Sequence, residues 1–251
     1  MEVHHPSHLA SGETHTGRKW VDHLWEFLML FLAVTLGFFV ENQREHLVEH
    51  RREKTYVRSI AEDLRQDIYN LDSIVRTRKK MDKVMDSLLY LMNNTDTREH
   101  GNEIYYFTRM IPRTFRFYTN DRTISQLKNA GNWRLISNQK VSDIVAKYDN
   151  LVRSLTVYIE QREESLVLIL YQSIDKLFDN KEFEKIVDGL SFVRPTGNPQ
   201  LVTYDKNELN EFANRVHFRK NANYYFIVVA GKLLEEATKT LSLIEEEYHL
   251  K

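Results

Sequence analysis

The stretch EFLMLFLAVTLGFFVENQREHLVEH, Glu26–His50, passes from an almost purely apolar run into dense charge. Within Phe27–Val40, only Thr35 and Gly37 lack an apolar side chain. A helix built from this segment is therefore apolar on all sides, whereas a helix that packs on a soluble core keeps a polar face. The composition favours lipid over a protein core as the surroundings of this helix.

The length of the apolar run fits a short membrane crossing. Helix from Leu24 to Val40 is about 25 Å long at 1.5 Å per residue, and the hydrocarbon core of a bilayer is about 30 Å thick. Trp20 and Trp25 are residues typical of the headgroup boundary. Bulky residues follow the run where a signal-peptidase site requires small ones. We therefore expect a transmembrane signal anchor over residues 20–40, preceded by a disordered, His-rich tail over residues 1–19.

Charged and small residues share one stripe of this helix. At 100° per residue, the stripe contains Asp22, Glu26, Leu30, Ala33 and Gly37. Small residues four apart let helix backbones approach closely in a membrane, and an ionisable group in a span usually faces protein or water. We hypothesise that the helix self-associates through this contact face. The alternative is that Glu26 simply lies at headgroup depth and that the small pair has no role.

Composition excludes some functions. The net charge of −1 gives no electrostatic reason to expect a nucleic-acid partner. The chain has no cysteine, so disulfides, thiolate nucleophiles and cysteine-based zinc sites are ruled out. Phosphate-binding glycine loops and nucleophile elbows are missing from the sequence, and we expect no cofactor.

The remainder of the chain, residues 41–251, has the pattern of a helical bundle domain. Residues 41–93 contain neither Gly nor Pro and continue the span as one long helix, with apolar residues at spacings of three and four. A second long helix is predicted from Asn138 to Phe178, and a last pair over Asn207–His217 and Phe218–Tyr248. The predicted class is all-α: one N-terminal transmembrane helix followed by an antiparallel bundle of three to four long, coiled-coil-like helices.

One turn of this bundle can be predicted in detail. Gly131 follows a short helix and is expected to adopt the left-handed conformation that ends it. Trp133 and Ile136 are then expected to pack the turn onto the bundle.

Two segments resemble a known group of sequences. One segment is the apolar span with the polar residue that follows it, and the other is the later LKNAGNWRLISN motif. The residues that carry the resemblance are Glu26, Asn42, Leu127, Lys128, Gly131, Asn132, Ile136 and Asn138. They resemble an uncharacterised family of single-span bacterial membrane proteins, mostly from Bacteroidetes-type bacteria. The chain departs from this family in its His-rich tail and at Trp133, where relatives usually carry an aliphatic residue. The resemblance implies a fold and a membrane location, and no reaction.

Two further motifs suggest chemistry. His46, Glu49 and His50 fit H-x-x-E-H, in which two histidines hold zinc and the glutamate polarises a water molecule. The motif lies in a highly charged helical segment without a convincing substrate-binding strand, so we interpret it as a solvated stalk and expect neither a metal site nor catalysis. In RMIPRTFRFYTNDR, Arg109–Arg122, arginines alternate with aromatics as in single-strand nucleic-acid binders. We expect instead that the aromatics plug a bundle end while the arginines reach outward.

The flanking charges leave the orientation open. Arg18 and Lys19 precede the span, and five basic residues follow it, which taken literally places the bundle in the cytoplasm. The signal-anchor pattern and the basic N-termini of similar sequences favour export, and we expect a bacterial inner-membrane protein with a periplasmic domain. The predicted function is a non-enzymatic scaffold, accessory subunit or signal-receiving domain whose partners are the lipid bilayer and a second copy or another membrane protein. The alternative is a subunit of an oligomeric pore or transport complex in which Glu26 faces a shared axis.

Overall fold

The computed structural model describes residues 16–189 and 191–250 and divides the chain into two units, residues 1–52 and 53–251. The described residues are predominantly helical, which confirms the all-α class; the strands among them are the short antiparallel pair β1 (Val187–Asp188) and β2 (Ser191–Phe192). Most of the predicted tail lies outside the described residues, but helix begins at Thr16, before the expected boundary at residue 19.

Helix α1 carries the apolar run and enters the second unit without interruption. The helical elements are α1 (Thr16–Asn94), η1 (Thr97–Glu99), α2 (Gly101–Met110), α3 (Arg122–Asn129), η2 (Asn132–Leu135), α4 (Gln139–Tyr158), η3 (Ile159–Glu163), α5 (Glu164–Leu177), α6 (Asn180–Glu184) and α7 (Lys206–Tyr248). The last helical region is thus one helix, where the sequence analysis expected two. Buried Val216, Ala222 and Phe226 continue its packing face through the expected break.

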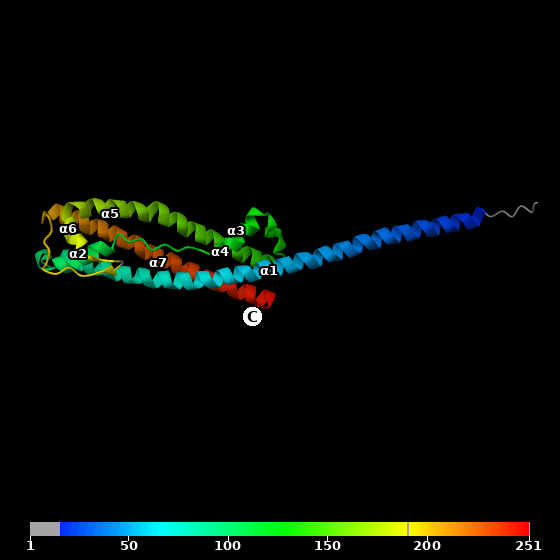
Figure 1. Cartoon of the computed structure of the whole chain (residues 1–251), viewed down its shortest axis with the longest axis horizontal. Helices are drawn as coiled ribbons and strands as arrows, with labels where there is room; N and C mark the ends of the chain where they lie inside the picture. The colour runs from blue at the N-terminus through cyan, green and yellow to red at the C-terminus, as the bar shows by residue number, and fades with distance from the viewer. Residues whose placement is uncertain (1–15, 190, 251) are drawn as a thin grey trace, which may run out of the picture. The chain divides into compact units, whose positions relative to one another are not determined.

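Three long helical segments form the second unit: α1 from Glu53 onward, α4 with η3 and α5, and α7 (Figure 1). Ion pairs between α1 and α7 join Arg65 to Glu245 at 2.7 Å and Asp86 to Lys220 at 2.8 Å, so these helices are antiparallel. The segment α4–α5 is also antiparallel to α7, as the pair Lys147–Glu236 near one end and Lys176–Glu208 near the other show.

The pair formed by α1 and α4–α5 departs from the predicted antiparallel arrangement. Hydrogen bonds join Glu53 to Ser137, Asp67 to Tyr148 and Arg78 to Glu163, so both segments run in the same direction. Parallel helices need a connection that returns along their length, and here residues 95–138 provide it.

Part of this connection is an irregular segment that we call the strap, residues 113–121 (Figure 1, the green line between α2 and α3). Pro112 precedes it, since proline cannot continue α2. In the strap, Phe117 is buried between exposed Arg116 and Tyr118, an alternation typical of extended chain. The arginine points outward as predicted, but the strap runs along the bundle and does not plug its end.

Two separate apolar clusters form the core. The first combines Val57–Val75 of α1 with residues of α4 and α7, and the second combines Met81–Leu88 of α1 with residues of α2, α5 and α7. On α1 the change from one cluster to the other falls between Val75 and Met81, on α4–α5 between Ile159 and Leu170, and on α7 between Phe226 and Val216. All three helices therefore leave a gap in the apolar core, and polar side chains fill it.

Candidate functional site

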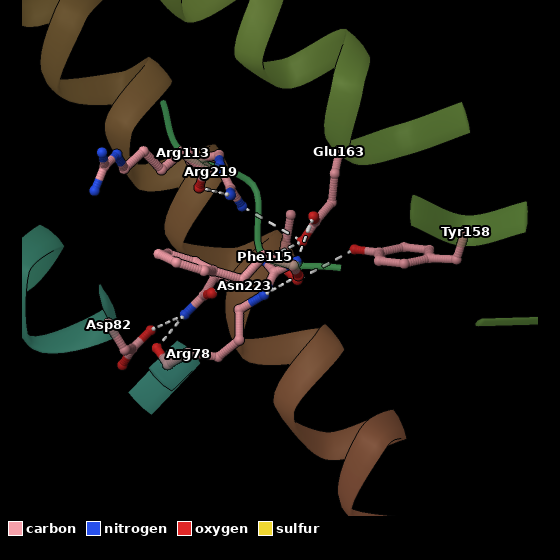
Figure 2. A network of polar contacts seen from close by, with 9 residues as sticks. Arg78, Asp82, Arg113, Phe115, Tyr158, Glu163, Arg219 and Asn223 are labelled. Carbon is pink, nitrogen blue, oxygen red and sulfur yellow. Dashed lines mark hydrogen bonds and ion pairs between the residues drawn. The ribbon is translucent and has the colours of Figure 1, made fainter. Parts of the chain in front are cut away.

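Each long helical segment places one charged side chain in this gap (Figure 2). Arg78 comes from α1, Glu163 from the end of η3 and Arg219 from α7, and none of the three side chains is exposed. Charged side chains are almost never fully buried unless they are paired. The network they form is therefore the most unusual polar feature of the second unit.

Arg78 and Glu163 form a bidentate ion pair. Arg78 Nη1 donates to Glu163 Oε1 at 2.8 Å, and Arg78 Nη2 donates to Glu163 Oε2 at 2.9 Å. Arg219 Nη1 donates to Glu163 Oε1 at 3.4 Å. Paired parallel hydrogen bonds of this kind fix the relative orientation of both side chains as well as their distance. One carboxylate thus connects all three long helical segments.

The same arginines hold the strap. Arg78 Nε donates to the carbonyl oxygen of Phe115 at 2.9 Å, and Arg219 Nη2 donates to that of Arg113 at 3.2 Å. In the described part of the chain, no backbone N–H group donates to either of these two carbonyls. The guanidinium groups therefore supply the hydrogen bonds that a neighbouring strand or helix would otherwise provide. The buried network and the position of the strap are therefore one structural unit.

Asn223 completes the network on the side of α1. Its Oδ1 accepts from Arg78 Nη1 at 3.3 Å, and its Nδ2 donates to the Arg78 carbonyl at 3.1 Å and to Asp82 Oδ1 at 3.3 Å. The guanidinium carbon of Arg78 lies 4.0 Å from the ring centre of Phe226. Arg78 therefore has a cation–π contact in addition to its hydrogen bonds.

Two guanidinium cations, Arg78 and Arg219, share the single carboxylate of Glu163. Burial lowers the pKa of Arg219; the charge of Glu163 opposes this shift, and that of Arg78 adds to it. Among the described residues, Arg219 Nε is a buried nitrogen without a hydrogen-bond partner. Arginine nevertheless keeps its proton in proteins, so the network is suited to fixing the register of the helices.

The π-helical turn explains how Glu163 reaches the core. Element η3 has five residues and follows Tyr158, the last residue of α4. Ile159 and Glu163 at its two ends are both buried. A π-turn inserts one residue into an α-helix, and such insertions occur frequently at functional sites. The insertion allows α4 and α5 to keep their own packing faces while the carboxylate points inward.

Sequence analysis missed this network, although one signal was present. Arg78 lies at helical spacing between Val75 and Met81, inside an apolar seam, and Arg219 follows Val216 in the same way. An arginine in a packing seam indicates a buried partner. The position of Glu163 could not be predicted, because a regular helical period does not reveal a π-turn.

A second set of buried carboxylates lies on α1. Asp67 Oδ1 accepts from the backbone nitrogen of Asn120 at 2.7 Å, and Asp67 Oδ2 accepts from Tyr148 Oη at 2.7 Å. Asp63 accepts from the backbone nitrogen of Thr123 at 3.2 Å, and Glu53 from that of Ser137 at 2.6 Å. These carboxylates satisfy backbone donors at the end of the strap, in the first turn of α3 and just before α4.

The predicted structural turn lies close to this set. Gly131 has a φ of 65°, in the left-handed region, and immediately precedes η2. Trp133 Nε1 donates to Ser142 Oγ at 2.9 Å, and Ile136 is buried. The turn thus contacts the beginning of α4 through Trp133, and Ile136 enters the apolar core.

The predicted membrane contact face lies in the first unit. Its members Asp22, Glu26, Leu30, Ala33 and Gly37 are all exposed in α1. His23 Nδ1 lies 3.4 Å from Glu26 Oε2, a contact the sequence analysis did not consider. A Cβ atom at Gly37 would meet nothing within 4 Å, so packing in the described structure does not require glycine there.

The H-x-x-E-H motif lies further along α1. His46 is exposed, and the described residues contain no group of three or more His, Asp or Glu side chains that could hold a metal ion.

The fold therefore defines an all-α protein with one helical segment that is long and apolar enough to cross a membrane, together with a helical unit built around a buried ionic network. No family model, no curated protein and no solved structure matches the chain.

Proposed function

We propose that the chain is a non-enzymatic, membrane-anchored helical module that acts by self-association or by binding a membrane partner. The observation that carries this proposal is the exposure of the apolar side chains over residues 20–40, with none of the apolar window buried. Covering a large apolar side chain stabilises a protein by about 1.5–3 kcal/mol, so a run of this length in water would cost roughly 20 kcal/mol or more. A lipid bilayer removes this cost without any further protein.

A cleaved signal sequence has the same length and composition. The large residues Phe38, Phe39 and Val40 favour an uncleaved anchor, because signal peptidase requires small residues after the apolar run. N-terminal sequencing of the mature protein distinguishes the two. An N-terminus beyond residue 40 would contradict anchoring.

Within the membrane, the proposed contact is the stripe that contains Ala33 and Gly37. The apolar side chains of this helix can face lipid, whereas Glu26 and the two small residues gain most from another helix. The lack of any packing reason for glycine at position 37 in the described structure supports this interpretation.

The absence of cysteine makes a clean crosslinking experiment possible. Single variants Leu30→Cys, Ala33→Cys and Gly37→Cys would be oxidised in native membranes. Leu28→Cys and Phe31→Cys, on the opposite side of the helix, serve as matched controls. We expect disulfide-linked dimers from the first set and few from the controls. Monomers throughout, or equal crosslinking on both sides, would contradict the contact face.

We also propose that the anchor lies in a bacterial inner membrane and that the second unit is periplasmic. Alkaline phosphatase fused to the C-terminus is active only after export, and green fluorescent protein fused there fluoresces only in the cytoplasm. We expect phosphatase activity without fluorescence. The reverse result would place the second unit in the cytoplasm, as the basic residues after the span predict.

A further inference from the structure

Between Glu62 and Lys80, one face of α1 carries no charged side chain. Gln66, Asn70, Ser73 and Thr77 follow one another at helical spacing, with Tyr69 beside them. The charged residues Arg76 and Lys79 occupy neighbouring exposed positions. In a chain with 28% charged residues, a continuous neutral stripe of amides and hydroxyls is a distinct surface.

Tyr69, Asn70, Ser73 and Thr77 of this face form one wall of a groove. The groove has a volume of about 520 Å³ and lies between α1 and the strap, which contributes Thr114–Tyr118. Ile74 and Phe117, each less than a tenth exposed, provide apolar surface in it. Tyr69 from α1 and Tyr118 from the strap are among its lining residues, with exposures of 67% and 73%. The groove thus combines aromatic faces with neutral polar groups.

Several polar groups in the groove lack protein partners. Within residues 16–189 and 191–250, the hydroxyls of Tyr69, Ser73, Thr114 and Tyr118 make no hydrogen bond to protein. Arg116, a charged residue of the lining, is ion-paired with Glu164. The groove on the other side of the strap differs, since Lys128 and Arg153 line it and share the carboxylate of Asp149.

We propose that the groove between α1 and the strap binds a short neutral saccharide. The faces of sugar rings carry C–H groups that pack against aromatic rings, and their hydroxyls both donate and accept hydrogen bonds, as do Ser73, Thr114 and the two tyrosines. An ionic ligand would find no unpaired charge in this lining. A peptide strand that pairs with the strap is the competing occupant, and the experiment includes it. The proposal does not depend on self-association of the anchor.

The test is calorimetric titration of the full chain in lipid nanodiscs free of glycolipid and of glycoside detergent. The probes are maltotriose, cellotriose and the trimer of N-acetylglucosamine; a capped Thr-Val-Thr-Val-Thr peptide and inorganic phosphate serve as comparators. We expect saturable binding of at least one saccharide and of neither comparator. Tyr69→Ala and Tyr118→Ala should each weaken this binding roughly tenfold or more, a difference of about 1.4 kcal/mol.

Tyr90→Ala is the matched control, because Tyr90 is 61% exposed on the same helix but does not line the groove. Ser73→Asp keeps an exposed helical residue but adds charge to the groove, and it should abolish binding. Circular dichroism verifies the fold of each variant. Failure of all saccharides to bind, equal binding by the tyrosine variants and the wild type, or preference for the peptide would each overturn the proposal. None of these results bears on the proposed self-association of the anchor, which the cysteine crosslinking tests separately.

Discussion

Glu163 accepts two hydrogen bonds from Arg78, at 2.8 and 2.9 Å, although 85 residues separate them in sequence and neither side chain is exposed. Arg219 shares the same carboxylate from the third long helical segment. This relationship fixes the register of the helices between two apolar clusters, and it places the strap because both arginines bind strap carbonyls.

Glu163→Gln should destabilise the second unit by about 3–5 kcal/mol, because it leaves two buried guanidinium groups without an anion. The matched control is Glu164→Gln. Glu164 pairs with Arg116 on the surface, so its substitution should cost no more than about 1 kcal/mol. Urea unfolding of the full chain in nanodiscs, followed by near-ultraviolet circular dichroism, measures both. Equal effects would show that the buried pair has no special role.

A triple variant should be more stable than Glu163→Gln alone if it replaces all three buried charges: Arg78→Met, Glu163→Leu and Arg219→Met. Replacing a whole buried ionic group by apolar residues is often neutral or stabilising, since no charge then remains uncompensated. Recovery to wild-type stability should be incomplete, because the carbonyls of Arg113 and Phe115 lose their donors. The same urea series tests this, and a triple variant less stable than Glu163→Gln would contradict it.

Deletion of Gln161 should remove the π-turn. Because a π-turn holds one residue more than the α-helix around it, the shortened segment can form a regular α-helix in which α4 and α5 keep approximately their relative phase, but the residues of the turn itself move. Glu163, the last residue of the turn, then loses the position from which it pairs with Arg78. We expect a large loss of unfolding cooperativity, whereas Gln161→Ala, at an exposed position, should have little effect. Hydrogen exchange of α5 amides distinguishes the two variants.

Gly101→Ala should also be strongly destabilising. A Cβ atom there would lie 1.9 Å from the carbonyl oxygen of Pro199, and the Gly101 nitrogen donates to Asn198 Oδ1 at 2.6 Å. Overpacking of this kind costs about 1–3 kcal/mol or more. Gly231→Ala is the opposite case, because nothing lies within 4 Å and the residue is inside α7; it should stabilise by about 0.5–1 kcal/mol. Thermal unfolding of the two variants should shift in opposite directions.

Stability should fall at alkaline pH, in part through Tyr148. Its burial, together with the neighbouring charge of Asp67, raises the pKa of this phenol in the folded protein above its ordinary value of 10.0. Below that value both states keep the proton and stability is complete. Above it the unfolded chain releases the proton and the folded chain does not, so stability falls by up to about 1.4 kcal/mol per pH unit.

Tyr148→Phe removes this contribution, so its stability should depend less on pH between about pH 9 and pH 11 than that of the wild type. It also loses the hydrogen bond to Asp67, which lowers its stability at neutral pH by about 1.5–3 kcal/mol. Urea midpoints measured across this range provide the comparison. Parallel pH profiles for the two proteins would contradict the assignment.

The all-α class followed from periodicity because the helices are long and few glycines and prolines interrupt them. The path of the chain through the bundle could not be predicted from this periodicity. A period of 3.6 residues specifies which side of a helix is apolar, but it does not reveal that residues 95–138 return along the bundle and make α1 parallel to α4–α5. The site was missed for a related reason: Arg78 and Arg219 could be recognised as charges in apolar seams, but their common partner depends on the π-turn at Ile159–Glu163. The contact of Gly101 with Pro199 is similarly a product of tertiary packing.

The most direct test of the account is fractionation of the full chain expressed in bacteria, with an alkaline carbonate wash of the membranes. Because the apolar side chains of residues 20–40 are exposed in α1, we predict that the protein sediments with membranes, resists the wash and is released only by detergent. Full-length protein that stays in the supernatant without detergent would contradict the membrane anchor and the proposed assembly through it.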